Sequence, residues 1–260
     1  MILAILQARA SSSRFPGKVL KPILGVPMLI RQIERVQRAK LIEKLVVATS
    51  DDVSDDPIER LCRENGITCF KGKLDDVLER FYQAAKPRHP GHIVRLTGDC
   101  PLADPYLIDQ AIDFHMQGNY DYTSNTLEPT YPDGLDVEVF RFSCLEQAWQ
   151  EAQLPSQREH VTPFLYRQPG RFKIGSYKNN VDLSHLRWTV DEPLDLKLVT
   201  KVYEALYPSN PNFATSDILA FLDENPELKV INTHFLRNEG FQKSLMEDTL
   251  FIYNLSKKGS

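Results

Sequence analysis

The stretch MILAILQARASSSRFPGKVLKP, residues 1–22, joins an apolar run to a cationic loop. Met1–Leu6 is apolar throughout, as is typical of a strand that is buried on both faces of a parallel sheet. Serines, arginines, lysines and a Pro-Gly pair follow directly. Ligands of open parallel sheets bind beyond the carboxyl ends of the strands. We therefore expect the loop after the first strand to lie at a binding site.

Beyond this stretch, short apolar runs alternate with amphipathic segments. The predicted strands cover residues 44–49, 67–70 and 92–96, and the predicted helices cover 28–39, 57–65 and 76–85. Gly66 follows the second of these helices, where a glycine commonly ends a helix. Alternating units of this length predict an α/β fold with a mostly parallel central sheet and helices on both faces.

The second half of the chain has a different pattern. Residues 135–140 (LDVEVF) alternate apolar and acidic side chains, which predicts a half-exposed strand. Further strands are expected at 172–177 and ending at 188–191, and helices at 145–152, 194–206 and 217–224, the last capped by Ser216. There is no internal repeat or linker. We expect one domain over residues 1–244 and a mobile tail over 245–260.

The composition of the chain excludes several classes of protein. With 42% apolar and 25% charged residues, the 260-residue chain is typical of a globular protein. A net charge of −4 argues against a broad nucleic-acid-binding surface. No apolar run approaches the roughly 20 residues of a membrane span, and the start has no signal-peptide pattern. The four cysteines form no C-x-x-C pair, which indicates reduced thiols. We expect a cytoplasmic protein without nucleic-acid or membrane partners.

The loop after the first strand has the composition of an anion-binding site. Backbone N–H groups of residues 10–13 can surround an anion because small side chains leave them accessible. Arg9, Arg14 and Lys18 add positive charge, and the Pro-Gly turn would direct Lys18 toward the site. An ordinary solvated basic loop would contain the same residues, so both interpretations stay open at this point.

Residues 7–22 resemble the N-terminal signature of nucleotidyltransferases that activate sugars and sugar acids with CTP, in which Pro or Gln precedes A-R-x-x-S-x-R-x-P-G-K. Four further blocks narrow the resemblance to the SpsF-type spore-coat polysaccharide branch, which is related to the CMP-sugar-acid synthetases. They are RLTGDCPLADP (95–105), YDYTSNTLEPTYPDGLDVEVF (120–140), SQREHVTPFLY (156–166) and LRWTVDEPLDL (186–196). The resemblance spans about residues 1–207. It implies a glycosyltransferase-A-like nucleotidyltransferase fold, a CTP-dependent cytidylyltransferase of polysaccharide biosynthesis, and a homodimer.

The resemblance also assigns roles along the chain. It implies a nucleotide-binding half over about residues 1–118, an acceptor-binding and dimerisation part over 119–207, and a helical part over 208–244. The implied catalytic residues are Lys18, Arg14 and Asp99, and the implied nucleotide-binding residues are Ala8, Arg9, Ala10, Ser11, Ser12, Ser13, Arg80, Thr97 and Gly98. The candidate acceptor-binding residues are Asn125, Tyr131, Asp133, Asp136, Glu138, Arg158, Glu159 and His160.

Asp99 and Asp191 are the candidate ligands of Mg²⁺. Each follows a predicted strand, so both would lie beside the cationic loop, and Mg²⁺ prefers carboxylate oxygens together with substrate phosphates. Each aspartate alone would more often be a turn or cap residue, and Asp99 could contact a ribose instead. Arg80 could form only a surface ion pair with Asp76, four residues before it. Asp51 and Asp52 are interpreted as loop acids.

The acceptor is left open by the sequence. Arg158 and His160 favour an anion such as an ulosonic acid, a sugar phosphate or a phosphoglycerate. An acceptor that is already ionised needs no strong base, whereas a hydroxyl acceptor would use His160. The strand at 135–140 could equally present a solvated face or a subunit contact. Other open functions are a nucleotidyltransferase for another nucleotide, a glycosyltransferase of the same fold, and a non-catalytic binding protein. The TGDCP block lacks the Asp-x-Asp motif of such glycosyltransferases.

Overall fold

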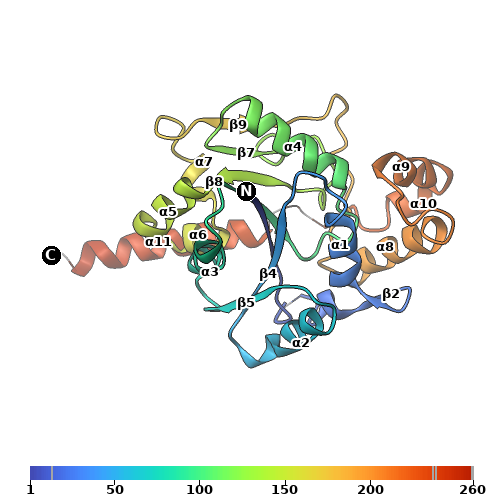
Figure 1. The fold of residues 1–260 in the computed structure, drawn as a ribbon, viewed down its shortest axis with the longest axis horizontal. Coiled ribbons are helices and arrows are strands. Elements are labelled where there is room, and N and C mark those ends of the chain that lie inside the picture. The colour runs from blue at the N-terminus through green and yellow to red at the C-terminus, as the bar shows by residue number, and fades with distance from the viewer. Residues whose placement is uncertain (13, 236, 238, 259–260) are drawn as a thin grey trace.

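The computed structural model describes residues 1–12, 14–235, 237 and 239–258 of the chain. The strands of the central sheet are β1 (Ile2–Gln7), β4 (Lys44–Ser50), β5 (Cys69–Gly72), β6 (His92–Thr97), β7 (Tyr122–Ser124), β8 (Glu138–Arg141) and β9 (Ile174–Ser176). They form a seven-stranded sheet in the order β5-β4-β1-β6-β8-β7-β9 (Figure 1). A short hairpin pairs β2 (Pro22–Ile23) with β3 (Val26–Pro27).

Helices connect most of these strands. The α-helices are α1 (Met28–Val36), α2 (Asp56–Glu64), α3 (Val77–Ala85), α4 (Pro105–Gln117), α5 (Phe142–Glu151), α6 (Pro155–His160), α7 (Pro163–Tyr166), α8 (Pro193–Leu206), α9 (Thr215–Glu224), α10 (Pro226–Lys229) and α11 (Glu239–Lys258). Single 3₁₀ turns occur at η1 (Lys18–Leu20), η2 (Val53–Asp55) and η3 (Lys86–Arg88). The α/β alternation predicted in the first half is confirmed, with boundaries that differ by a few residues.

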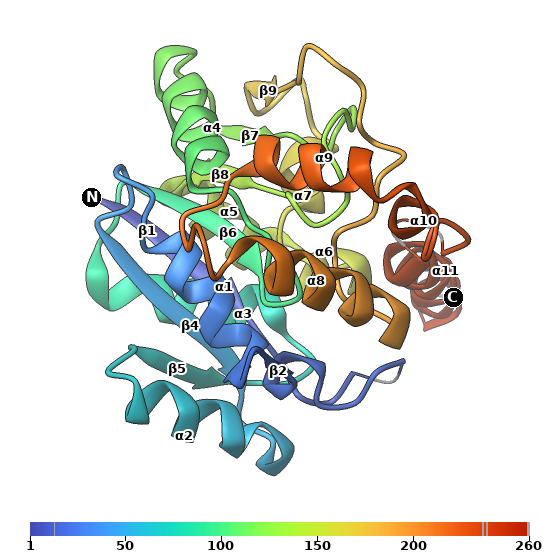
Figure 2. The ribbon, with the colours of Figure 1, turned by 90° about the vertical axis from the view of Figure 1, so that its right-hand side faces the viewer.

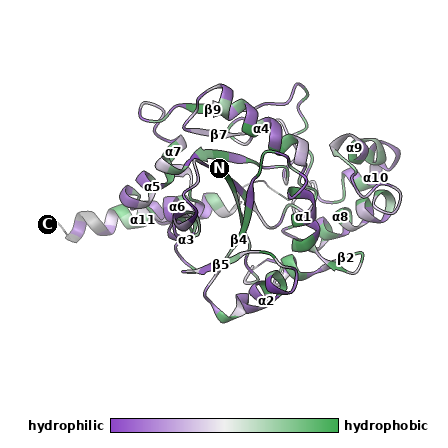
Figure 3. Cartoon of the chain, in the orientation of Figure 1, coloured by the Kyte–Doolittle hydropathy of each residue, from purple (hydrophilic) through white to green (hydrophobic). Residues whose placement is uncertain are grey.

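Helices cover both faces of the sheet, as predicted. Along β1, Leu3 and Ile5 pack into a core with α3, α5 and α7, while Ala4 and Leu6 pack into a second core with α1, α4 and α8. This division follows from the strand geometry, because successive side chains point to opposite faces. Figure 2 shows α1 and α8 together on the second face. In Figure 3 the central strand β4 is apolar, whereas the helices carry both colours because only one face of each meets the sheet.

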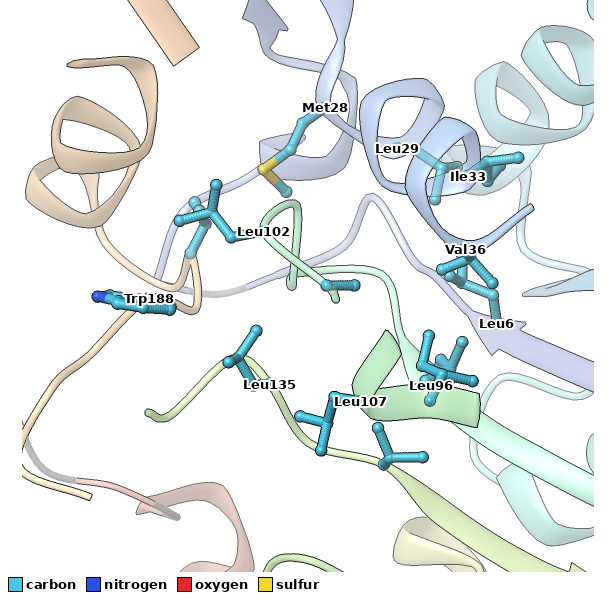
Figure 4. Close-up of a cluster of buried hydrophobic side chains, with 14 of the residues drawn as sticks. Leu6, Met28, Leu29, Ile33, Val36, Leu96, Leu102, Leu107, Leu135 and Trp188 are labelled. Atoms are coloured by element: carbon cyan, nitrogen blue, oxygen red, sulfur yellow. The ribbon is translucent and has the colours of Figure 1, made fainter. Parts of the chain in front are cut away.

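The second core extends beyond the sheet to the carboxyl ends of its strands. Figure 4 shows Leu6 and Leu96 from β1 and β6 near Leu107, with Leu102, Leu135 and Trp188 closing the cluster. Trp188 is fully buried. Burial of each such large side chain contributes about 1.5–3 kcal/mol relative to exposure. The loops that follow β1 and β6 are therefore fixed to a packed core.

The topology places a crevice beside β1. The chain runs outward from β1 to β4 and β5, and then returns through α3 to β6 on the other side of β1. All four strands are parallel, so the connections that leave β1 and β6 diverge at their carboxyl ends. A crevice at such a switch point is the usual ligand site of an open α/β sheet. The loop at residues 8–17 starts there.

Two of the predicted strands differ from the structure. The alternation at 135–140 predicts a half-exposed strand, but Val137, Glu138, Val139 and Phe140 are all buried, because Val137 and Val139 pack into one core and Phe140 into the core on the other face of the sheet. Residues 188–191 form no strand in the described part of the chain. The Trp188 and Thr189 amides instead donate to the Asp133 carbonyl, and the Val190 amide donates to the Asp99 carbonyl at 2.8 Å.

The C-terminal region also differs from the prediction. Residues 245–258, expected to be a mobile tail, continue α11 as helix. This helix packs on α6, and Asp248 accepts hydrogen bonds from the Ser156 amide and hydroxyl at 2.8 and 2.5 Å.

Helix α9 begins at Thr215 rather than after Ser216, because Asp104 accepts a hydrogen bond from the Thr215 amide at 3.1 Å. In the described residues, no helix has the length and apolarity needed to cross a membrane. The four cysteines are free thiols, as predicted.

Candidate active site

A cleft of about 770 Å³ opens at the carboxyl ends of β1 and β6. Gln7 and Thr97, the last residues of the two strands, line its floor. The cleft brings together predicted residues from every part of the chain, namely Ala8, Arg9, Ser12, Arg14, Lys18, Arg80, Thr97, Gly98, Asp99, Arg158, Glu159, His160 and Asp191. It thus combines the predicted nucleotide side with part of the predicted acceptor side in one space.

The loop that follows β1 is held by backbone contacts and by one buried acid. The Ala10 amide donates to Asp55 Oδ1 at 2.6 Å, and the Gly17 amide donates to the Ala10 carbonyl at 2.8 Å. Gly17 has φ +69°, a left-handed conformation that glycine adopts without strain, and it starts the turn that carries Lys18. Because Asp55 occupies the Ala10 N–H, this amide is not available to an anion, contrary to our expectation for residues 10–13.

Gly98 allows the loop after β6 to touch the loop after β1. The Gly98 amide donates to the Gln7 carbonyl at 2.7 Å. A Cβ atom at this position would lie 2.9 Å from the Ala8 Cβ and 3.0 Å from the Gln7 carbonyl oxygen. The fully buried Gln32 braces the same loop from below, because its amide group donates to the Thr97 carbonyl at 2.7 Å. The two loops are therefore locked together at the floor of the cleft.

Lys18, Asp99 and Asp191 meet in the cleft although they are distant in sequence. Lys18 Nζ lies 3.0 Å from Asp99 Oδ2 and 2.7 Å from Asp191 Oδ1. Arg14 reaches the same Asp191 oxygen at 2.9 Å. The predicted convergence of the cationic loop with two acids is thus present in the structure. The side chains of Lys18, Asp99 and Asp191 are in direct contact. The local charge therefore depends on three segments that are far apart in the sequence.

The electrostatics of this cluster keep the Lys18 ammonium and the Asp99 carboxylate ionised. Burial alone would lower the pKa of Lys18, but Asp99 and Asp191 outweigh it and raise this pKa above its usual value. Burial alone would raise the pKa of Asp99, but Lys18 and hydrogen bonds from Thr97 and Cys100 lower it to about 2. Opposite charges at this range favour the charged forms of both groups. Lys18 and Asp99 therefore both carry their charges at physiological pH.

A buried arginine fixes the position of Asp191. Arg187 Nη2 donates to Asp191 Oδ2 at 3.1 Å, and its guanidinium also contacts both oxygens of Asp195 at 3.0 Å. Asp195 is fully buried and accepts the amides of Asp191 and Glu192, each at 2.9 Å. Burial would lower the pKa of Arg187, but Asp195 and the other acids raise it. Asp191 is therefore held by its own backbone and by a rigid guanidinium.

Asp99 and Asp191 fit the requirements of a Mg²⁺ site. Their carboxylate oxygens converge on one ammonium group, and Mg²⁺ is commonly bound by one or two carboxylates plus substrate phosphates. Among the described residues, no group of three or more histidine, cysteine or acidic side chains is arranged for a metal. A cation here would consequently need oxygen atoms of a substrate or water to complete its coordination.

Arg80 and Arg9 bring positive charge to the cleft that no described acid pairs. Arg80 is only 3% exposed, and its Nε and Nη1 atoms have no hydrogen-bond partner in the described structure. Burial lowers the pKa of the Arg80 guanidinium. The surface pair of Arg80 with Asp76 that we considered does not form, because Asp76 caps α3 and pairs with Arg158. A buried guanidinium without a partner indicates a site for an anion.

Helix α6 forms the opposite wall of the cleft. Arg158 pairs with Asp76 and donates to the Trp149 carbonyl at 3.0 Å, which fixes its guanidinium. His160 Nε2 lies 2.9 Å from the Ser244 hydroxyl, which donates to Glu159 Oε2 at 2.6 Å. Burial lowers the pKa of His160. His160 is therefore neutral at pH 7 and can accept a proton.

Several predicted residues lie outside the cleft. Ala10, Ser11, Asn125, Tyr131, Asp133, Asp136 and Glu138 do not line it, and Ser13 lies outside the described residues. Glu138 is buried, pairs with Arg95 and accepts the Tyr122 hydroxyl at 2.8 Å. Asn125 is buried and bridges the backbone of Leu135 and Val137. These two side chains hold the sheet together and do not face an acceptor in the cleft.

Tyr131, Asp133 and Asp136 form a layer behind the site. Tyr131 stacks on Tyr177 with ring centroids 6.1 Å apart, and Asp133 Oδ2 accepts from Arg187 Nη1 at 3.0 Å. Asp136 accepts from Arg237 at 2.7 Å. Burial raises the pKa of Asp136 to about 7, against the effect of Arg237. Asp133 supports Arg187, and through it Asp191, rather than lining the cleft.

Sequence reasoning missed two groups of residues. Asp55, Gln32, Arg187 and Asp195 are buried polar side chains that hold the loops. Gln32 lies in a predicted helix, and Arg187 and Asp195 lie in the block at 186–196, in which only Asp191 has a predicted role. The second group, Gly240, Lys243, Ser244 and Glu247, lines the cleft from α11. A regular spacing of polar residues in this helix was the available signal, but it is common to exposed helices.

Comparison with known proteins identifies the family of this chain. A family model described as "Cytidylyltransferase" matches residues 3–238. Spore coat polysaccharide biosynthesis protein SpsF of Bacillus subtilis is 33% identical over 241 residues, which cover 87% of this chain and 95% of that protein. A cytidylyltransferase structure from Leptospira borgpetersenii shows a TM-score of 0.83 and 32% identity over 88% of this chain and 96% of that one.

A more distant structure shares the fold. The CMP:2-keto-3-deoxy-manno-octonic acid synthetase complexed with CTP has a TM-score of 0.62 at 18% identity, over 78% of this chain and 98% of that one. The predicted nucleotidyltransferase fold and the resemblance to the SpsF-type branch are confirmed by these comparisons. The family match over most of its length shows that the chain belongs to the cytidylyltransferase family and is a nucleotidyltransferase.

Proposed function

We propose that the protein transfers the cytidylyl group of CTP to an anionic acceptor and releases pyrophosphate. The observation that carries this proposal is the contact of Lys18 with both Asp99 and Asp191 at the floor of the cleft. An ammonium beside two carboxylates suits a triphosphate that arrives with a divalent cation. The choice of CTP is supported by the family and by the CTP complex of a synthetase with the same fold.

The chemistry is an in-line displacement at the α-phosphorus of CTP. An acceptor oxygen forms the new bond to phosphorus, while the bond to the oxygen that bridges the α- and β-phosphates breaks. Pyrophosphate leaves with this oxygen and its electron pair. Lys18 and Arg14 stabilise the phosphate charges, and the braced loops after β1 and β6 hold them in place. Catalysis is then mainly positioning and electrostatic stabilisation.

Asp99 and Asp191 would hold Mg²⁺. Both side chains are already fixed by Lys18, and Asp191 also by Arg187. When bound, Mg²⁺ supplies neutralisation of the phosphate charge. Asp99, with its pKa of about 2, is an anion at neutral pH.

The acceptor binds on the α6 side of the cleft in this proposal. A carboxylate or phosphate oxygen is ionised at pH 7 and attacks without a base. A hydroxyl acceptor requires proton removal, for which His160 is suited because it is neutral at pH 7. The name of the SpsF relative supports a place in surface polysaccharide synthesis. A homodimer is a further proposal, which sedimentation velocity tests.

The first experiment is pyrophosphate release with Mg²⁺, in which CTP, UTP, ATP and GTP are each combined with a panel of anionic acceptors. The expected result is release with CTP and one class of acceptor, and loss of release when EDTA removes Mg²⁺. Release with UTP or another nucleotide in place of CTP would contradict the cytidylyl assignment. Absence of CTP binding in calorimetry would overturn the proposed function as a whole.

A further inference from the structure

Helix α11 lines the cleft although it lies outside the matched family region. The family model ends at residue 238, and α11 begins at Glu239. Gly240, Lys243, Ser244 and Glu247 all line the cleft. Their spacing of three and four residues places them on one face of the helix. This face therefore adds residues of the C-terminal segment to the cleft, and Figure 1 shows α11 passing beside α6, on which it packs.

The position of this face is fixed by contacts with α6. The Ser244 hydroxyl bridges His160 Nε2 at 2.9 Å and Glu159 Oε2 at 2.6 Å. One turn further, Asp248 accepts two hydrogen bonds from Ser156. Phe241 meets the His160 ring edge-on at a centroid distance of 5.0 Å. Lys243 lines the cleft from the same helix, so it shares this space with the α6 residues Arg158, Glu159 and His160, which are candidates for binding the acceptor.

The charges of the cleft leave Lys243 available to a ligand. Lys18 and Arg158 are compensated by Asp99, Asp191 and Asp76. Among the described residues, neither Lys243 nor Glu247 has an ion-pair partner, although the two are one helical turn apart. An ammonium binds carboxylate or phosphate groups, whereas a carboxylate accepts hydrogen bonds from hydroxyl groups. The two side chains therefore match a ligand that carries both kinds of group.

We propose that α11 forms an acceptor subsite in which Lys243 binds the carboxylate or phosphate of the acceptor and Glu247 binds its hydroxyl groups. The subsite takes a polyhydroxylated anion, that is, a sugar acid or sugar phosphate. This inference rests on the proposed cytidylyl transfer and adds the acceptor class to it. Ser244 is a positioning residue that holds Glu159 and His160 at the same wall.

Binding calorimetry with a non-reacting nucleotide tests the subsite. The protein is first saturated with Mg²⁺ and α,β-methylene-CTP, in which a methylene group replaces the bridging oxygen and prevents transfer. The probes are 3-deoxy-manno-octulosonate, glucose 1-phosphate and 3-phosphoglycerate. The variants are Lys243→Ala and Glu247→Gln. Lys257→Ala is the matched control, because Lys257 is an exposed lysine of the same helix that does not line the cleft.

The expected result is that one of the two sugar probes binds the wild-type protein. Lys243→Ala then weakens this binding by about tenfold or more, as for loss of one charge-assisted hydrogen bond, while Lys257→Ala leaves it unchanged. Glu247→Gln weakens sugar binding by a smaller factor. Equal sugar affinity of Lys243→Ala and wild type would overturn the subsite. Binding of 3-phosphoglycerate alone would overturn the hydroxyl role of Glu247 and the assigned class.

The same titrations separate this inference from the proposed function. If α,β-methylene-CTP binds and none of the probes does, the subsite is wrong while the nucleotide site stands. If α,β-methylene-CTP fails to bind, the proposed function fails, and the subsite falls with it. Thermal unfolding of each variant checks the fold, which should be unaffected because Lys243 and Glu247 are exposed.

Discussion

At the scale of single residues, the site depends on charges that are only partly balanced in the protein itself. Lys18 and Arg14 face Asp99, Asp191 and Glu192, while Nε and Nη1 of the buried Arg80 have no hydrogen-bond partner in the described structure. Buried charges are costly unless they are paired. In the proposed function, a triphosphate and a cation would pair with these charged side chains. This would explain why the side chains lie in a cleft instead of at the surface.

Lys18→Ala tests the central charge of the site. Loss of this ammonium removes a group that stabilises phosphate charge, so we expect turnover to fall about 100-fold or more. It also leaves Asp99 and Asp191 without their shared partner, so the pKa of Asp99 should rise. Pyrophosphate release gives the rate, and circular dichroism checks the fold. Lys21→Ala, an exposed lysine three residues away, serves as the control and should keep wild-type turnover. An unchanged rate in Lys18→Ala would exclude the assigned role.

Arg80→Met tests the buried guanidinium that has no partner. Two unpaired buried donors destabilise the ligand-free protein, so their removal should raise its stability by about 1 kcal/mol. The same change should weaken CTP binding by about tenfold, because an anion loses its guanidinium partner. Thermal unfolding and calorimetry measure the two effects. Arg60→Met, at an exposed position of α2, is the control. A destabilised variant with normal CTP affinity would show that Arg80 is purely structural.

At the scale of secondary-structure elements, the cleft is assembled from loops and helix ends that are tied to one another. The loop after β1 is held by Asp55 from the start of α2, the loop after β6 by Gln32 from α1, and Asp191 by Asp195 from α8. Each of these hydrogen bonds joins a loop of the cleft to a residue in, or at the start of, a helix. The catalytic side chains are thus positioned by the packing of helices on the sheet.

Asp248→Ala tests how α11 is attached. The change removes the acceptor of two hydrogen bonds from Ser156, so α11 should separate from α6 more often. We expect faster amide hydrogen exchange in residues 239–258 and unchanged exchange in β1, β4 and β6. Thr249→Ala, at the exposed neighbouring position, should leave exchange as in the wild type. Equal protection of α11 in Asp248→Ala and wild type would mean that apolar contacts alone hold the helix.

At the scale of the whole molecule, one buried pair links stability to pH. His92 Nδ1 lies 3.0 Å from His115 Nε2, and His115 Nδ1 lies 3.0 Å from the Thr123 hydroxyl. Burial, together with His92 and Arg141, lowers the pKa of His115 to about 3. In the unfolded chain this histidine takes up a proton near pH 6.5. Its contribution to stability is therefore complete above pH 6.5 and is lost as the pH falls toward 3.

Denaturant unfolding at pH 8 and pH 5 measures this contribution. Between these values the His115 term should lower the free energy of unfolding of the wild-type protein by about 2 kcal/mol. His115→Gln has no such titration, so its loss over the same interval should be smaller by about this amount. His234→Gln, at an exposed histidine, should behave as the wild type. The same loss in His115→Gln and wild type would assign the acid sensitivity to other groups.

The sequence alone predicted the elements of the first half because their signals are local. Apolar runs, helical spacing and the Gly66 end of α2 depend on neighbouring residues, and the structure places Gly66 at φ +67° as a helix end requires. Asp191 follows no strand in the structure and is held in the cleft by contacts with Lys18 and Arg187, whereas the cationic loop and Asp99 were predicted as site residues because they follow β1 and β6. Strand ends of a parallel sheet meet at one edge, so position along the chain already implies position in the fold.

Only the tertiary structure decided which polar residues hold the site. Asp55, Arg187 and Asp195 have no role predicted from the sequence, because their importance comes from burial and from partners that packing brings to them. The acidic alternation at 135–140 predicts a half-exposed strand, but the cores on both faces of the sheet cover it, and Glu138 is buried with Arg95 and Tyr122 as partners. The α11 wall depends in the same way on contact with α6. Such contacts join residues that are distant in sequence, so no local pattern encodes them.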